Sequence, residues 1–134
     1  MPIDQPKPEE RFVVIVDDDA SVRQSARRLI RALGYRAEAF GSAEEFLHSG
    51  AVKSTAYLIL DVRMPGMDGL ELQRRLAGSA IPIVFITGRS SEEEERQALQ
   101  AGAVAFLRKP VDKQALLRVL GAVLETSESD GGKP

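Results

Sequence analysis

The 134-residue chain contains no cysteine. A disulfide framework and a thiolate metal site are therefore excluded, and the chain fits a reducing compartment such as the cytoplasm. It also lacks a strong excess of either charge, since 18 Lys and Arg residues stand against 20 Asp and Glu residues, for a net charge of −2. Because nucleic-acid surfaces depend on an excess of basic residues, this balance argues against nucleic-acid binding by this domain.

The two ends of the chain lack long apolar runs. Residues 1–10, MPIDQPKPEE, contain three prolines, so we expect a short disordered lead there and neither a signal peptide nor a membrane anchor. Residues 126–134 are polar and contain glycine, as expected of a flexible tail or the start of a linker. Residues 11–125 suit one compact domain, whose size requires no metal or disulfide for stability.

Strand and helix signals alternate along residues 11–125. Apolar runs of the kind that parallel sheets bury predict strands over residues 12–17, 36–40, 57–61, 81–86 and 103–107. Between them, apolar stripes predict helices: the first ends at Gly34, the second opens with a capping box from Ser42 to Glu45, and three more cover about 68–78, 90–102 and 112–125. Five such units predict an α/β fold with a doubly wound, five-stranded parallel sheet.

Polar residues that could carry chemistry follow four of the predicted strands. Asp17 and Asp18 follow the first strand, Asp61 the third, Thr87 the fourth and Lys109 the fifth. Ligands of such sheets bind at the carboxyl ends of the strands, so we expect these side chains to gather there. Neighbouring carboxylates disfavour one another's charged form, so the group needs either protons or a cation. A hard, all-oxygen ligand set suits Mg²⁺, or Mn²⁺ in its place.

Four segments, VDDD, LILDVRMPGMDG, FITG and FLRKP, occur in this order along the chain. Together they resemble the receiver domain of two-component response regulators, and the resemblance covers residues 11–125. It implies a flavodoxin-like (βα)5 fold with strand order 2-1-3-4-5. The segments GSAEEFL and AGAVAFLRKP further resemble the nitrogen-fixation branch of these regulators.

The resemblance implies a role for each member of the acidic group. Asp61 would be the phosphoacceptor. Asp18 and the backbone carbonyl of Arg63 would be direct Mg²⁺ ligands, while Asp17 would reach the ion through water. Phosphoryl transfer needs positioning and neutralised charge more than covalent assistance, so this equipment is adequate. Such a chain would catalyse only its own phosphorylation and dephosphorylation and would not otherwise be an enzyme.

The resemblance also implies the residues that respond to the phosphoryl group. Lys109 would pair with Asp61 and then with phosphoryl oxygens, and the peptide bond between Lys109 and Pro110 would be cis. Thr87 would bond the phosphoryl group through its hydroxyl, and Phe106 would change rotamer when it does. The implied partners are a histidine kinase or a histidine phosphotransfer protein. The fourth helix, fifth strand and fifth helix are the surface implied for a homodimer or an output partner.

Three other polar features have structural interpretations. Asp19 is interpreted as a helix N-cap and not as a metal ligand, since a carboxylate there satisfies free N–H groups. The acidic run from Glu92 to Glu95 is interpreted as a first helical turn on a solvated face. His48, beside Gly50 at a helix end, is interpreted as solvated.

Two competing functions fit the sequence less well. The stretch DDDAS resembles the Asp-x-Asp motif of haloacid dehalogenase-type phosphatases, but that family needs a further acidic motif after its lysine, and one helix follows Lys109. A flavodoxin-like cofactor binder would need a Ser/Thr/Gly-rich phosphate loop where this chain has carboxylates. The sequence leaves open whether the chain is a stand-alone receiver, a phosphorelay shuttle or part of a longer regulator. Arg63 and Arg89 occupy positions that vary among receivers and influence phosphoryl lifetime.

Overall fold

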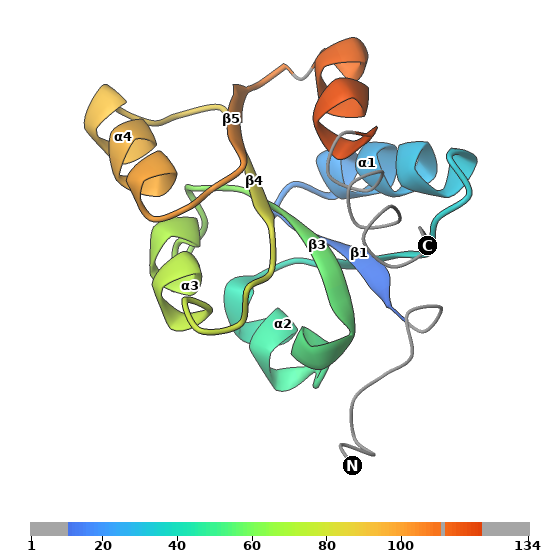
Figure 1. Ribbon diagram of the computed structural model, residues 1–134, viewed down its shortest axis with the longest axis horizontal. Coiled ribbons are helices and arrows are strands. Elements are labelled where there is room, and N and C mark those ends of the chain that lie inside the picture. The colour runs from blue at the N-terminus through green and yellow to red at the C-terminus, as the bar shows by residue number, and fades with distance from the viewer. Residues whose placement is uncertain (1–10, 111, 122–134) are drawn as a thin grey trace, which may run out of the picture.

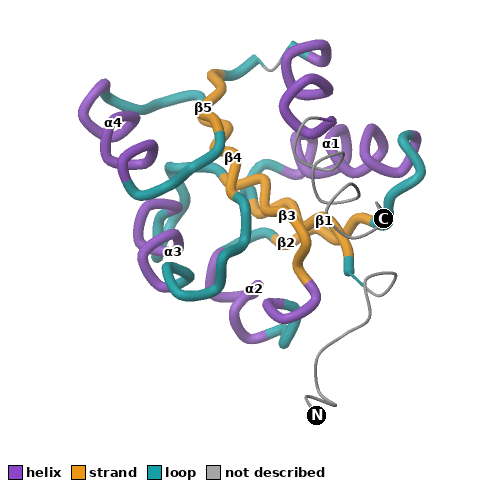
Figure 2. Tube along the Cα trace, viewed as in Figure 1, coloured by secondary structure: helices purple, strands orange, loops and turns teal. Residues whose placement is uncertain are grey.

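The computed structural model describes residues 11–110 and 112–121. One sheet of five parallel strands runs through the described part, in the order β2-β1-β3-β4-β5. Figure 1 shows the chain with its helices around this sheet, and Figure 2 labels all five strands. The strands are β1 (Phe12–Val16), β2 (Ala37–Phe40), β3 (Thr55–Leu60), β4 (Ile83–Thr87) and β5 (Ala105–Arg108). The doubly wound parallel fold and its strand order are therefore confirmed. The predicted lead at residues 1–10, the end of the last helix at 122–125 and the tail at 126–134 lie outside the described residues.

Helices cover both faces of the sheet. They are α1 (Ala20–Ala32), α2 (Ala43–His48), the short 3-10 helix η2 (Val52–Ser54), α3 (Gly69–Arg75), α4 (Glu92–Gln100) and a last helix over residues 113–121. Figure 2 shows α1 and the last helix on one side of the strands and α2, α3 and α4 on the other. This arrangement leaves the carboxyl ends of the strands open at one edge of the sheet.

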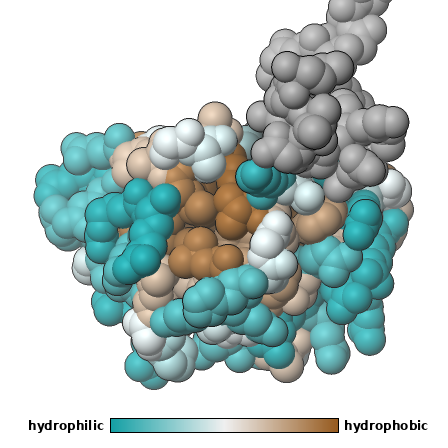
Figure 3. Space-filling view, turned by 90° about the horizontal axis from the view of Figure 1, so that it is seen from below, coloured by the Kyte–Doolittle hydropathy of each residue, from teal (hydrophilic) through white to brown (hydrophobic). Residues whose placement is uncertain are grey.

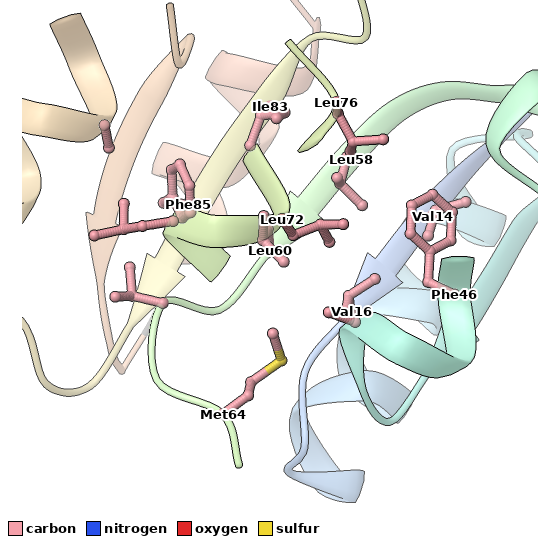
Figure 4. Packing of buried hydrophobic residues seen from close by; sticks show 14 residues of the cluster. Val14, Val16, Phe46, Leu58, Leu60, Met64, Leu72, Leu76, Ile83 and Phe85 are labelled. Carbon is pink, nitrogen blue, oxygen red and sulfur yellow. The ribbon is translucent and has the colours of Figure 1, made fainter. Parts of the chain in front are cut away.

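A hydrophobic cluster joins the sheet to α2, α3 and α4. Buried side chains of the strands, such as Val14 and Leu60, pack there with Phe46, Leu72 and Ala98 of the three helices. In Figure 4, Phe46 lies beside Val14, and Leu72 points toward Leu60. The strand residues of this cluster alternate with those that face the other side, as the period of two in a strand requires.

A second cluster joins the opposite face of the sheet to α1 and the last helix. Ile15 and Ile59 pack there with Ile30 of α1 and Leu116 and Leu120 of the last helix. Because both faces are covered, the central strands are continuous apolar runs, and β1, β3 and β4 are almost entirely buried.

Several boundaries differ from the sequence-based predictions for physical reasons. Strand β4 begins at Ile83 and not at residue 81, since Pro82 has no N–H to donate and contributes only its carbonyl, which accepts from Leu58 N–H at 2.9 Å. Strand β3 begins two residues earlier than predicted, at Thr55, which pairs with Phe12. Strand β5 begins at Ala105, two residues later than predicted.

The predicted helix ends are largely confirmed. Asp19 is the N-cap of α1 and accepts from Ser21 N–H at 2.9 Å, and Gly34 has a φ of +94° just beyond the helix. The capping box predicted at α2 is half present. Ser42 accepts from Glu45 N–H, whereas the Glu45 carboxylate accepts from Gly41 N–H at 2.7 Å and not from Ser42.

The surface carries both polar and apolar areas. Figure 3 shows one face on which hydrophobic side chains gather at the centre, with hydrophilic side chains around them. His48 is exposed at the end of α2, as predicted, and the run from Glu92 to Glu95 is the first turn of α4. Within residues 11–110 and 112–121, no helix has the length and apolar character needed to cross a membrane.

Candidate functional site

Three carboxylates meet where β1 and β3 end. Asp17 and Asp18 follow β1, Asp61 follows β3, and one oxygen from each lies within 4.8 Å of the other two. Asp17 and Asp61 are buried, whereas Asp18 is exposed. Burial of these two carboxylates follows from the register, since each directly follows a strand that is covered on both faces. The structure therefore brings together the acidic group that the sequence predicts.

Lys109, at the end of β5, is the cation beside these carboxylates. Its Nζ lies 3.0 Å from Asp17 Oδ2 and 3.3 Å from Asp61 Oδ2. The peptide bond between Lys109 and Pro110 is cis, as the resemblance implies. One ammonium thus bridges two buried carboxylates, which leaves the acidic group with a net negative charge.

The shifted pKa values follow from this crowding. Burial and the charge of Asp17 raise the pKa of Asp61 to about 6, although Lys109 opposes the rise. Burial alone would lower the pKa of Lys109. The hydrogen bond and charge of Asp17, together with the charge of Asp61, outweigh burial and raise the pKa of Lys109 above its ordinary value. The ammonium therefore stays charged, and burial together with the charge of Asp17 disfavours the charged form of Asp61.

Backbone groups hold the two buried carboxylates in place. Asp17 Oδ1 accepts from Asp19 N–H at 2.9 Å, and Asp61 Oδ1 accepts from Arg63 N–H at 3.3 Å. For the carboxylate of Asp18, the described part of the chain supplies no hydrogen bond or ion pair. Asp18 is thus the member of the group that is most available to an added cation.

Arg23 supports the acidic group and was missed by the sequence-based reasoning, which placed it only on the polar face of α1. Its Nη1 donates to the carbonyl oxygen of Asp17 at 2.8 Å. The same nitrogen lies 3.4 Å from the position that a Cβ would occupy on Gly41, in the loop after β2. Arg23 therefore holds the backbone of Asp17 by a hydrogen bond and packs beside Gly41 in the loop after β2. No local sequence signal identifies a contact with a backbone carbonyl.

Thr87, at the end of β4, is fully buried, and its hydroxyl is occupied within its own loop. Oγ1 donates to the carbonyl of Arg89 at 2.8 Å and accepts from Arg89 N–H at 3.1 Å. The structure thus places Thr87 at the predicted edge of the sheet, with its hydroxyl engaged by the loop after β4 and not by the acidic group.

Phe106 lies on β5 beside β4. Its ring is half-buried, with its centroid 5.8 Å from that of Phe85, and the Arg108 guanidinium lies 5.7 Å from the Phe106 centroid. Arg108 also contacts α4, since its Nη2 lies 2.9 Å from Glu95 Oε1, and the loop before α4, since its Nη1 donates to Ser90 Oγ at 3.0 Å. Phe106 therefore lies against the Arg108 side chain, which connects β5 to Ser90 and Glu95 at the start of α4.

The loop between β3 and α3 is fastened at two points. Its Met67 N–H donates to Glu44 Oε2 of α2 at 2.9 Å, beside Gly66, which has a φ of +76°. Gly69, the first residue of α3, lies directly against the backbone of Asp61, since a Cβ built on Gly69 would be 2.2 Å from the Asp61 carbonyl oxygen. The glycine after Met-Asp in this loop is therefore needed for the close approach of α3 to the backbone of Asp61.

The donor set fits a hard divalent cation. Three carboxylates offer oxygen ligands, and the described residues place neither histidine nor cysteine in this group. Mg²⁺ is bound in proteins by one or two carboxylates and keeps several waters, which an exposed Asp18 beside two buried carboxylates allows. The residues that are present therefore fit the ion that the sequence indicates.

Comparisons with known proteins agree with this geometry. A family model described as response regulator receiver domain matches residues 13–121. The response regulator protein TmoT of Ectopseudomonas mendocina is 40% identical over 119 residues, which are 87% of this chain and 54% of the relative. The transcriptional regulatory protein FixJ of Bradyrhizobium diazoefficiens is 33% identical over 118 residues, which are 87% of this chain and 58% of that protein.

Solved structures lead to the same family. The crystal structure of a response regulator receiver protein from Burkholderia phymatum superposes with a TM-score of 0.74 at 46% identity, covering 86% of this chain and 95% of that one. The chain belongs to the response regulator receiver domain family. It is a two-component receiver, a signalling phosphoacceptor of the kind that histidine kinases phosphorylate. It spans about half the length of the curated relatives that it matches, and its likeness to FixJ agrees with the nitrogen-fixation-like branch.

Proposed function

We propose that Asp61 is the residue that accepts the phosphoryl group, and that Asp17, Asp18 and Arg63 support it by holding a divalent cation. The observation that carries this proposal is the pairing of Asp61 with Lys109, at 3.3 Å, inside a group of three carboxylates. Asp61 is anchored by both oxygens, since Oδ2 lies against the Lys109 ammonium and Oδ1 accepts from the Arg63 N–H. Asp17 is anchored in the same way, by Lys109 and the Asp19 N–H. Asp61 is favoured over Asp17 by its place at the end of the central strand β3, in the segment LILDVRMPGMDG that resembles the acceptor segment of receivers.

The proposed donor is a phosphohistidine of a histidine kinase or of a histidine phosphotransfer protein. A carboxylate oxygen of Asp61 attacks phosphorus, an O–P bond forms, the N–P bond breaks, and the released histidine nitrogen takes up a proton. Lys109 serves this step by moving its contact from the Asp61 oxygen to phosphoryl oxygens, which spreads the developing negative charge.

The cation in this proposal is Mg²⁺, or Mn²⁺ in its place. Asp18 and the Arg63 carbonyl would hold it directly, and Asp17 would hold it through water. When bound, it neutralises charge on the carboxylates and on the phosphoryl oxygens. Asp17 also holds Lys109 at 3.0 Å, so this residue positions the ammonium as well as the ion.

The proposed response begins at Thr87. Its hydroxyl would leave the Arg89 carbonyl, where it now donates at 2.8 Å, and donate to a phosphoryl oxygen. A charge-assisted hydrogen bond of this kind contributes roughly 1.5–3 kcal/mol, which suffices to shift a two-state equilibrium ten-fold or more. The Phe106 ring would then move into space beside β4, and α4, β5 and the last helix would form the changed surface for a homodimer or output partner.

The proposed receiver unit covers residues 11–125, with residues 1–10 and 126–134 flanking it. The family match over 13–121 supports these limits. A cytoplasmic setting fits a chain without cysteine. The unit would catalyse only its own phosphorylation and dephosphorylation.

Incubation with acetyl phosphate and Mg²⁺ tests the proposal. Intact mass spectrometry should show one added phosphoryl group on the wild-type protein, none on Asp61→Asn, and none on the wild type when a chelator replaces Mg²⁺. Asp68→Asn is a matched control, because Asp68 lies in the same loop but caps α3. Equal labelling of wild type and Asp61→Asn would contradict the assignment.

A further inference from the structure

The backbone of Arg63 lies beside the acidic group, whereas its positively charged guanidinium is held on α4. It lies two residues beyond Asp61, and its backbone N–H donates to Asp61 Oδ1 at 3.3 Å. Its side chain is 55% exposed and makes one ion pair with a described residue, in which Nη2 lies 2.8 Å from Glu94 Oε1 of α4. A long, exposed arginine is thus fastened to a helix 31 positions further along the chain.

Glu94 is well built to hold that arginine. It is the third residue of α4, and it closes a capping box in which Ser91 N–H donates to Glu94 Oε1 at 3.0 Å and Glu94 N–H donates to Ser91 Oγ at 3.1 Å. The side chain of Glu94 is only 19% exposed. Glu94 Oε1 therefore accepts from both the Ser91 N–H and the Arg63 guanidinium. The helix cap alone fixes the position of this oxygen, whether or not Arg63 is bound to it.

Without that acceptor, the guanidinium would be free to turn toward the carboxylates beside its own backbone N–H, which donates to Asp61 Oδ1 at 3.3 Å. An arginine side chain is always charged and binds carboxylates through two parallel hydrogen bonds. Lys109 already neutralises part of the charge of Asp17 and Asp61, at 3.0 and 3.3 Å. Asp18 is left, because its exposed carboxylate has no recorded partner among the described residues, and it is the carboxylate that an added cation would use first.

We propose that Glu94 is a positioning residue that holds the Arg63 guanidinium on α4 and thereby keeps it from competing with a divalent cation at the acidic group. The inference rests on the proposed function, because it assumes that Asp17, Asp18 and Asp61 bind such a cation. It assigns to the acidic first turn of α4 a role that helix capping alone does not require. The neighbouring Glu95 pairs with Arg108 instead, at 2.9 Å.

Glu94→Gln is the cleanest variant, because glutamine at the third helical position can still accept from Ser91 N–H and keep the capping box, while it loses the charge that holds Arg63. The matched charge control is Glu92→Gln, since Glu92 is exposed in the same turn and the described chain records no ion pair for it. Arg63→Met keeps the stem of the side chain and removes the guanidinium.

The experiment is a titration of each variant with MgCl₂, followed by backbone amide NMR shifts of the acidic group. We expect Glu94→Gln to bind Mg²⁺ about five-fold more weakly, the ratio that matches the upper range for an exposed ion pair. Arg63→Met keeps the backbone carbonyl that the proposal assigns to the ion and removes only the guanidinium, so its affinity is the reference for the double variant. The double variant, Glu94→Gln with Arg63→Met, should regain the affinity of Arg63→Met, and Glu92→Gln should bind like the wild type.

The double variant separates positioning from a general charge effect. If the two substitutions simply added their charges, Arg63→Met would strengthen binding equally with and without Glu94, and that result would overturn the proposal. An unchanged Mg²⁺ affinity of Glu94→Gln, in a wild type that binds Mg²⁺, would overturn it as well. A wild type that shows no Mg²⁺-dependent shifts would instead overturn the proposed metal site, and this inference with it.

Discussion

Gly69→Ala is the substitution for which the structure gives the most definite expectation. Gly69 is the first residue of α3, and its N–H donates to the Val62 carbonyl at 2.9 Å. A Cβ at this position would lie 2.2 Å from the carbonyl oxygen of Asp61 and 3.1 Å from Cε1 of Phe85. Both neighbours are fixed, since the oxygen belongs to the backbone after a buried strand and the ring belongs to the core.

The size of the clash sets the expected cost. A carbon and a carbonyl oxygen in contact are normally at least about 3.3 Å apart, so the start of α3 would have to move by about 1 Å. Overpacking of this kind costs about 1–3 kcal/mol, and we expect about 3 kcal/mol because neither neighbour can rotate away. For a domain of this length, that loss lowers the melting temperature by about 10 °C.

Urea denaturation and thermal melts of Gly69→Ala, followed by circular dichroism, test this expectation. Gly78→Ala is the matched control, because Gly78 follows the same helix and a Cβ there would have no neighbour within 4 Å. The control should lie within about 0.5 kcal/mol of the wild type or be slightly more stable. A Gly69→Ala protein as stable as the control would refute the argument that α3 needs a glycine to approach Asp61.

Three further predictions concern the acidic group and its loop. Lys109→Met should lower the unfolding free energy of the metal-free protein at neutral pH by about 1–3 kcal/mol in urea, because two buried carboxylates lose their cation; an unchanged midpoint would contradict this. In metal-free protein, burial and the charge of Asp17 raise the pKa of Asp61 from 3.8 to about 6, so its contribution to stability is largest below pH 3.8 and is lost as the pH rises through 6. Asp61→Asn should flatten that part of the curve of unfolding free energy against pH, and parallel curves would argue against the shift. Gly66→Ala should destabilise by about 1–2 kcal/mol in thermal melts, because φ is +76° and a Cβ would displace the Glu44 carboxylate, whereas a neutral effect would exclude that contact.

The sheet and the position of the acidic group are the parts that the sequence predicts well. The apolar runs before Asp17 and Asp61 are long enough to be buried on both faces, and parallel strands place their carboxyl ends at one edge. Strand β4 begins two residues later than the apolar run predicts, because Pro82 within that run has no N–H to donate to a neighbouring strand. Burial is therefore readable from hydropathy, whereas the first ladder hydrogen bond depends on the partner strand.

The supporting contacts of the site are not predictable in this way. Arg23 and Glu94 look like ordinary surface residues of amphipathic helices. Their contacts depend on partners that the fold brings near: the Asp17 carbonyl, which accepts from Arg23, and the Arg63 guanidinium, which donates to Glu94. Thr87 is a different case, since its position at a strand end is readable but the direction of its hydroxyl is a rotamer choice. Contacts between long side chains far apart in the chain leave no local periodicity to detect.

The most direct test of the central claim is the chemical identification of the phosphorylated residue. The protein is phosphorylated with acetyl phosphate and Mg²⁺, and the acyl phosphate is then reduced with borohydride, which converts the modified aspartate into homoserine. Tandem mass spectrometry of the peptides locates that homoserine. Our account predicts it at position 61 alone, and homoserine at position 17, 18 or 68 with an unmodified Asp61 would contradict it.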